Sequence, residues 1–219
     1  VVDAALAWPG LEGEGRRLLL ARIAAMAYVL SDPDFNPRGI GMHLGNPNMP
    51  INRFMGFPQY AGLLPSHPMH EAWMTEANRY SLWKWADNVS PGGAWREEIS
   101  YQQAGVPHLM DAALSLRNSG ALDPAVLPYV REQNQYNLAC VCPPDANEGG
   151  LRGCEGTGNG GRVRAGFPVY AANLLKDTDP QMAGEMMWLW QSFGTPTQTQ
   201  YGLSPLAVDT TIAPLAPRD

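Results

Sequence analysis

The sequence predicts an all-α protein built from helical hairpins that are joined by long loops rich in glycine and proline. Two observations predict this class. Apolar residues recur every three to four positions through most of the chain, and no alternating pattern of comparable length indicates a strand. Clusters drawn from 23 glycines and 20 prolines divide these periodic stretches into separate pieces.

The periodic stretches predict seven helices. The first carries Leu19, Ile23 and Leu30 along one face. The third carries an aromatic stripe that includes Trp73 and Trp83. The predicted helices span residues 15–30, 51–64, 68–89, 101–118, 123–136, 166–176 and 179–193.

The predicted helix starts share one sequence feature, a proline that follows a residue able to cap a helix. Asp-Pro occurs at 32–33, 123–124 and 179–180, and His-Pro at 67–68, so a capping side chain precedes a proline suited to the first turn. Leu-Leu precedes two of these sites, at 63–64 and 174–175, where we expect one helix to end and its antiparallel partner to begin. Such hairpins stack as a solenoid or close into a ring, and the irregular spacing argues against a regular repeat array.

Composition bounds the class of protein. The chain has 219 residues, 45% of them hydrophobic, which suits one large domain or two small ones. The net charge is -6 and the basic residues are scattered, so a nucleic-acid surface is not expected. No apolar run is long enough to span a bilayer. A start without methionine and a proline-rich end are expected of a piece of a longer protein.

Three cysteines lie in or beside one irregular stretch, residues 140–164. Cys140, Cys142 and Cys154 have no fourth soft ligand nearby in sequence, which disfavours zinc. Two alternatives stay open: a disulfide between Cys154 and one of the others in an exported protein, or three unpaired buried thiols in a reducing compartment. The GTGNGG string lacks the strand and the Lys-Ser/Thr ending of a phosphate loop. We expect a structured loop over a cleft.

Three patches resemble a known family. At HLGNPNMPINR (43–53) and PGGAWREEISYQQAGVPHLMDAALSL (91–116), the chain resembles the heparinase II/III-like polysaccharide lyases, whose relatives include alginate and chondroitin lyases. A third patch, LLKDTDPQMAGEMMWLWQSFG (174–194), is similar to a later helix pair in that group. The resemblance implies an incomplete (α/α) toroid over residues 1–205, with residues 206–219 leading toward a missing C-terminal β-sandwich domain. It also implies a secreted or periplasmic protein.

The chemistry that the resemblance implies is β-elimination on a uronic-acid-containing polysaccharide. The proton beside the sugar carboxylate is removed, so the site must neutralise that carboxylate as negative charge grows. The family gives this role to an asparagine, which corresponds here to Asn46, with Asn48 as the close alternative. His43 offers a donor or a base, and Arg53 offers a bidentate guanidinium. Prolines within this stretch restrict the backbone and hold the amides in place.

The base that the resemblance implies is Tyr101, which takes the carbon proton and passes a proton to the leaving oxygen. A tyrosine phenol must lie beside positive charge to act as a base near neutral pH, and Arg96 or Arg53 is expected to supply it. Trp95, in a loop, is expected to stack on a sugar ring. The substrate-binding residues expected around the base are Asn48, Trp95, Arg96, Glu97 and Glu98.

Each of these residues also has a structural interpretation. The asparagines and His43 serve equally as caps of the following helix, Tyr101 as a core aromatic, and the two glutamates as favourable residues at a helix start. Two rival functions follow: a glycoside hydrolase on an (α/α) barrel, and a non-catalytic glycan-binding domain. Adjacent glutamates are expected to diverge, which disfavours the acid and base pair of a hydrolase. Elimination requires no cofactor, and calcium is left open.

Overall fold

The computed structural model of the chain describes residues 2–35, 51, 56–156, 161–196 and 207–218. Within those ranges the backbone forms isolated β-bridges and no strand, so the all-α prediction is confirmed. The helices are α1 (Val2–Ala7), α2 (Gly13–Ser31), α5 (Phe57–Gly62), α6 (His70–Asn88), α7 (Gln102–Asn118), α8 (Leu127–Ala139), α9 (Pro168–Leu175) and α10 (Pro180–Ser192), with 3₁₀ turns η1 (Pro124–Val126) and η2 (Ala146–Glu148).

The helix boundaries follow the apolar periodicity closely. The stretches predicted at 68–89 and 101–118 form α6 and α7. In the stretch predicted at 51–64, Ile51 is helical and α5 covers the later part, while residues 52–55 lie outside the described residues. The helix predicted at 123–136 begins as the 3₁₀ turn η1 and continues as α8 to Ala139.

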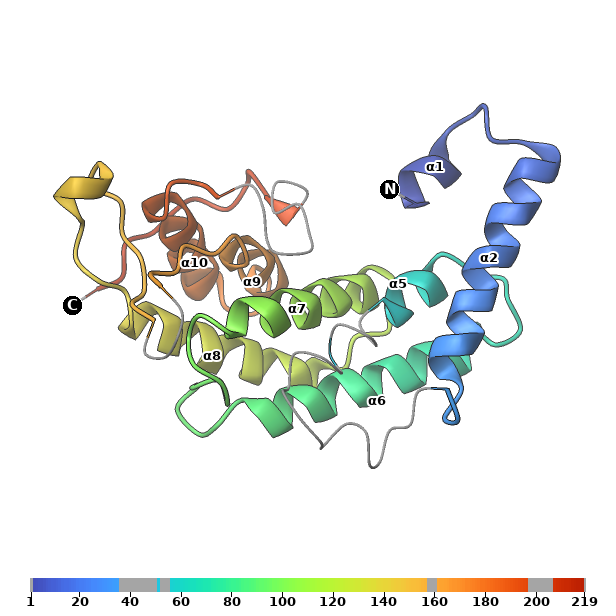
Figure 1. The fold of residues 1–219 in the computed structure, drawn as a ribbon, viewed down its shortest axis with the longest axis horizontal. Coiled ribbons are helices and arrows are strands. Elements are labelled where there is room, and N and C mark those ends of the chain that lie inside the picture. Colours follow the sequence, from blue (N-terminus) through green and yellow to red (C-terminus); the bar gives the residue numbers. More distant parts are fainter. Residues whose placement is uncertain (1, 36–50, 52–55, 157–160, 197–206, 219) are drawn as a thin grey trace.

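The long helices α6, α7 and α8 lie along one another in the middle of the molecule (Figure 1). At one end α2 runs transversely to the long helices and packs against α5 and α6. At the other end α9 and α10 pack against each other, and α8 contacts both of them. A short turn, residues 176–179, joins α9 to α10, so this pair is a helical hairpin of the kind that the sequence predicts.

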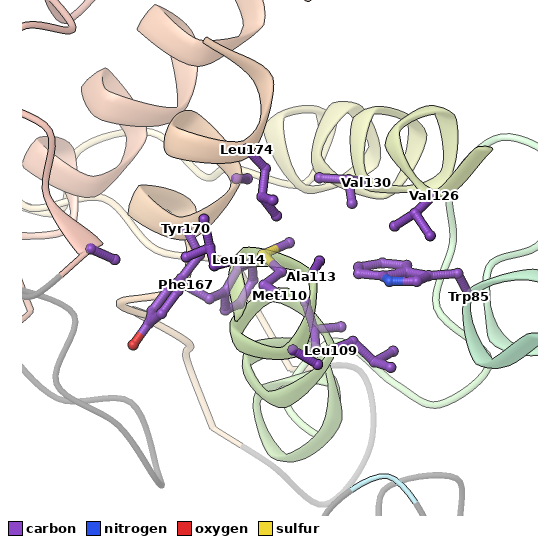
Figure 2. Close-up of a cluster of buried hydrophobic side chains, with 14 of the residues drawn as sticks. Trp85, Leu109, Met110, Ala113, Leu114, Val126, Val130, Phe167, Tyr170 and Leu174 are labelled. Atoms are coloured by element: carbon purple, nitrogen blue, oxygen red, sulfur yellow. The ribbon is translucent and has the colours of Figure 1, made fainter. Parts of the chain in front are cut away.

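The core is centred on α7. Figure 2 shows Leu109, Met110 and Ala113 of this helix meeting Trp85 from α6 and Leu174 from α9. Leu109, Met110 and Trp85 are fully buried. Burial of one such side chain stabilises the fold by about 1.5–3 kcal/mol relative to its exposure to water. Helix α7 therefore fixes the positions of the neighbouring helices. It also fixes the end of the segment that joins α6 to α7, residues 89–101.

Two of the predicted aspartate caps are confirmed. The Asp123 carboxylate accepts a hydrogen bond from the backbone nitrogen of Ala125 at 2.9 Å, and the Asp179 carboxylate accepts one from that of Met182 at 3.1 Å. Asp32 was predicted to cap a following helix, and this was wrong. It ends α2, and its carboxylate accepts from a nitrogen in the turn that follows. An aspartate before proline suits a turn as well as a helix start.

The C-terminal stretch 207–218 lies against α9 and α10. Lys176 Nζ is 2.9 Å from an Asp209 carboxylate oxygen, and the backbone nitrogen of Leu215 donates to the carbonyl of Gly184 at 2.9 Å. A Cβ on Gly184 would lie only 2.9 Å from Leu215 Cβ, so the close approach requires glycine. That this stretch leads to a further domain stays a prediction.

Candidate functional site

A tight turn begins the segment between α6 and α7. The backbone nitrogen of Gly93 donates to the carbonyl of Ser90 at 2.9 Å, with Pro91 and Gly92 between them. Gly92 has a φ of 88°, and proline followed by such a residue is the signature of a type II turn. The nitrogen of Ser90 also donates to the carbonyl of Ala94 at 2.9 Å, which closes the turn.

This segment is held against α8 by a backbone contact. A Cβ at Gly93 would overlap the carbonyl oxygen of Glu132 and come within 3.0 Å of Tyr136 Cβ. Two positions later, Trp95 forms an isolated antiparallel bridge with Val89 and is only 6% exposed. The turn therefore aims the residues after Gly93 at the C-terminal end of α8.

The segment forms one wall of a pocket of about 80 Å³. The first turn of α7 and the end of α8 form two more walls, and the loop after α8 closes the pocket. The site lies where α6 and α8 end and α7 begins, at the left of the helical body in Figure 1. The lining residues are Trp95, Glu97, Glu98, Ile99, Gln102, Tyr136, Cys140 and Glu155.

Burial changes the acidity of groups in this pocket. Burial raises the pKa of Glu97 above its ordinary value, against the opposing effect of the Trp95 indole, whose Nε1 donates to the carboxylate at 3.3 Å. Glu98 accepts a hydrogen bond from the hydroxyl of Ser100. A hydrogen bond with Cys140 is the main cause that raises the pKa of Tyr136. Glu97 therefore holds a proton more readily than an exposed glutamate does.

Two guanidinium groups of the described residues beside this pocket are engaged in ion pairs, Arg96 with Asp87 and Arg162 with the lining residue Glu155. Arg96 NH1 lies 3.4 Å from Asp87, with its side chain largely exposed. Arg162 Nε lies 3.1 Å from Glu155, and its NH1 lies 2.6 Å from Asp145. Neither arginine lines the pocket.

A chain of buried amides lies behind the pocket and joins α7 to α8. Gln102, which is 1% exposed, donates through Nε2 to Asn137 Oδ1 at 2.9 Å and accepts through Oε1 from Gln133 Nε2 at 2.6 Å. Gln133 Oε1 and Asn137 Nδ2 have no hydrogen-bond partner among the described residues, although both side chains are at least 98% buried. Buried polar atoms are usually paired, so these two call for an explanation.

The structure brings together only some of the predicted site residues. Trp95, Glu97 and Glu98 all line one pocket, so both glutamates border the same cavity. Tyr101 is 37% exposed at the N-cap of α7 and does not line the pocket. Four predicted residues lie outside the described residues: His43, Asn46, Asn48 and Arg53.

The sequence interpretation missed the part of the pocket that comes from elsewhere in the chain. Tyr136 and Cys140 come from the end of α8, Glu155 from the loop, and Gln102 from the first turn of α7. One signal was available: α8 carries amides at 133, 134 and 137, on the face where apolar residues are expected.

The three cysteines are free thiols. Cys154 is buried, and burial raises its pKa to about 12. Among the described residues, no three side chains of His, Cys, Asp or Glu lie close enough together to hold a metal ion. Of the three cysteines, Cys140 lines the pocket. In the described part of the chain, the cysteines are not part of a metal site.

No family model, curated protein or solved structure matches this chain. In the described ranges, no helix combines the length and the apolar character needed to cross a membrane. Function is therefore inferred from the chemistry of the pocket and from the sequence patches quoted above.

Proposed function

We propose that the chain is the helical part of a polysaccharide lyase that cleaves a uronic-acid-containing glycan by β-elimination. One observation carries the proposal. The segment after α6 brings Trp95, Glu97 and Glu98 to a pocket and ends at Tyr101, whose side chain is half-exposed where α7 begins. An aromatic wall and hydrogen-bonding carboxylates in one pocket, followed in the chain by an accessible phenol, suit the binding and deprotonation of a sugar.

Tyr101 lies where α7 begins, as the N-cap residue of that helix. The N-terminal end of a helix carries partial positive charge and stabilises an anion beside it. Arg96 or Arg53 was expected to supply this charge; Arg96 is paired with Asp87, and Arg53 lies outside the described residues. The start of α7 offers an alternative source, because Tyr101 is its N-cap residue.

The proposed reaction proceeds through one enolate-like intermediate. The phenolate of Tyr101 takes the proton from the carbon beside the uronate carboxylate, and the electron pair left behind spreads into that carboxylate as an enolate. This electron pair then forms the carbon–carbon double bond as the bond to the 4-linked oxygen breaks, and the tyrosine proton passes to that oxygen. Asn46, with Asn48 as the alternative, neutralises the carboxylate together with His43 and Arg53.

The proposed architecture is an incomplete (α/α) toroid. Consecutive helices that pair as α9 and α10 do are a feature that suits such a ring. A polysaccharide substrate also favours a secreted or periplasmic location.

Product analysis of the full-length protein tests this proposal. We expect ultraviolet absorbance from the unsaturated uronate product when the protein is incubated with a panel of uronate polysaccharides. The Tyr101→Phe variant is expected to lose turnover and to keep most of its binding, because it lacks only the proton-transfer group. Turnover that is unchanged in this variant would remove Tyr101 from the mechanism.

A second candidate, a glycoside hydrolase, is favoured by the pair of glutamates in the pocket. Burial raises the pKa of Glu97, which suits a general acid, while the neighbouring Glu98 or Glu155 would act as the ionised partner. A hydrolase releases reducing ends without a new double bond. New reducing ends without ultraviolet absorbance would therefore favour the hydrolase, and binding without either product would favour a glycan-binding domain.

A further inference from the structure

Two cysteines approach each other at the C-terminal end of α8. The carbonyl oxygen of Asn137 accepts a hydrogen bond from the backbone nitrogen of Cys140 at 3.1 Å and another from Cys154 Sγ at 3.8 Å. Cys140 is the C-cap residue of α8, and Cys154 belongs to the loop that returns to this helix end. Because both groups reach one oxygen atom, the sulfur of Cys154 lies close to the backbone of Cys140.

The backbone holds Cys154 in this position from two sides. Its nitrogen donates to the carbonyl of Val163 at 3.0 Å, and its carbonyl accepts from the nitrogen of Val163 at 2.7 Å. On the other side it forms an antiparallel bridge with Val141, the residue after Cys140. With paired segments about 4.8 Å apart and a rise of about 3.4 Å per residue, a residue beside the direct partner lies about 6 Å away. This is the separation of Cα atoms that a disulfide needs, about 4.4–6.8 Å.

The directions of the side chains favour Cys140 over Cys142 as the partner. The nitrogen of Cys142 donates to the carbonyl of Gly153 at 2.8 Å, so these two residues lie opposite each other. Successive side chains of an extended segment point to opposite faces, which places Cys142 on the face away from Cys154. Arg162 covers that face, since its Cγ would lie 2.8 Å from a Cβ on Gly153. Against the lowering effect of burial, a hydrogen bond with the Cys142 side chain helps to raise the pKa of Arg162.

Cys140 does not follow this alternation, because it belongs to the end of a helix, with a φ of -91° and a ψ of 0°. A hydrogen bond with Cys140 is the main cause that raises the pKa of Tyr136, and the charge of Cys154 adds to the effect, so both sulfurs lie near this phenol. Burial is the main cause that raises the pKa of Cys154, and the effect of Cys140 on it exceeds that of Cys142. Cys140 and Cys154 are therefore the closer pair of thiols.

We propose that Cys140 and Cys154 are a redox pair that closes into a disulfide in an oxidising compartment. The oxidant is a low-molecular-weight disulfide such as glutathione disulfide. The thiolate of Cys140, which is half-buried in the pocket wall, attacks one sulfur of the oxidant, forms a mixed disulfide and releases one glutathione thiolate. The thiolate of Cys154 then attacks the sulfur of Cys140 and releases the second. The two protein thiols are oxidised, and their protons pass to the two glutathione thiolates.

The disulfide fastens one wall of the pocket to α8. Glu155 lines the pocket from the loop and directly follows Cys154, while Cys140 lines it from the end of α8. The link also closes residues 140–154 into a loop, which restricts the unfolded chain and stabilises the folded one. The inference does not depend on the reaction that the protein catalyses. The redox state of the two thiols controls how firmly this wall is held.

Peptide mapping identifies the link. Reduced full-length protein is incubated with glutathione disulfide, the exchange is quenched with acid, and the remaining thiols are blocked. Cleavage by trypsin after Arg152 separates Cys154 from the other two cysteines. We expect mass spectrometry to show the two peptides joined by a disulfide that dithiothreitol removes. The absence of joined peptides, or the presence of glutathione mixed disulfides alone, would overturn the proposal.

Two matched variants assign the partner of Cys154. Cys140 and Cys142 lie on the same tryptic peptide, so their serine variants are compared in the same assay. Cys142→Ser is expected to keep the joined peptides, and Cys140→Ser is expected to lose them. Circular dichroism confirms that both variants are folded. Cys140→Ser oxidised in urea is the positive control, because the unfolded chain lets the two remaining cysteines meet. Joined peptides in native Cys140→Ser, or their loss in Cys142→Ser, would overturn the assignment.

Urea unfolding tests whether the two thiols are already in position to pair. We expect the oxidised protein to unfold at a urea concentration about 1 M higher than the reduced protein, because the closed loop lowers the entropy of the unfolded chain. Dithiothreitol should return the midpoint to that of the reduced protein, and Cys140→Ser should show no shift. A link that forms but leaves the midpoint unchanged or lower would show that the fold must be distorted to make it, and would overturn the proposal.

Discussion

Replacing Gly93 by alanine tests whether the segment that carries the pocket is held on α8 by a backbone contact. Gly93 has a φ of 88°, and a Cβ there would overlap the carbonyl oxygen of Glu132. A backbone carbonyl has no rotamer with which to move aside. The segment would have to lift away from α8, and Trp95 and Glu97 would move with it.

The neighbouring glycine separates the two contributions to the cost. Gly92 has the same φ of 88°, but a Cβ there would meet nothing within 4 Å. Gly92→Ala therefore costs only the backbone strain, about 1–2 kcal/mol. Gly93→Ala adds the overlap with Glu132, and overpacking of this kind costs a further amount of about 1–3 kcal/mol.

Urea unfolding of both variants measures this difference in the free energy of unfolding. We expect Gly93→Ala to be less stable than Gly92→Ala by about 1–3 kcal/mol, and to bind oligosaccharide more weakly. Equal losses of stability in the two variants would show that the segment does not depend on close contact with α8, and would refute the description of how the pocket is formed.

Two further predictions follow from buried titratable groups. Burial raises the pKa of Glu97 above its ordinary 4.5, so its contribution to stability is full below pH 4.5 and is lost as the pH rises through the raised pKa. The Glu97→Gln variant cannot ionise at this position, so its free energy of unfolding should rise relative to that of wild type as the pH rises above 4.5. The other titratable groups of the pocket are the same in both proteins: Glu98, Tyr136, Cys140 and Glu155. A stability difference between the two proteins that does not change with pH would contradict this. Burial raises the pKa of Cys154 to about 12, so alkylation of this thiol near pH 8, followed by mass spectrometry, should be far slower in the native protein than in urea. Rapid native modification of Cys154 would contradict its burial.

The helical framework could be predicted because its signals are local. Apolar spacing determined α6 and α7 to within two residues at each end, and the carboxylates of Asp123 and Asp179 cap helices through neighbouring backbone nitrogens. Asp32 was assigned wrongly for the same reason. Its sequence neighbourhood matches a helix start, but the same side chain serves a turn in which its carboxylate accepts from Asp34.

The sequence predicted only those residues of the candidate site that lie in the segment between α6 and α7. Trp95, Glu97 and Glu98 are close in sequence, so their common location required no long-range contact. Tyr136 and Glu155 reach the same pocket only because α8 packs beside the start of α7, and this packing depends on side chains far apart in sequence. Polar residues on α8 are ordinarily assigned to the surface. Their burial depends on the packing of α8 against α7, which a local sequence pattern does not show.

A structure of the full-length Tyr101→Phe variant with a bound uronate oligosaccharide tests the central claim most directly. The account predicts one continuous sugar chain that occupies the pocket beside Trp95 and Glu97 and brings a uronate within hydrogen-bonding reach of the position of the lost hydroxyl. A sugar bound on another face, or a chain that leaves either the pocket or position 101 untouched, would contradict it.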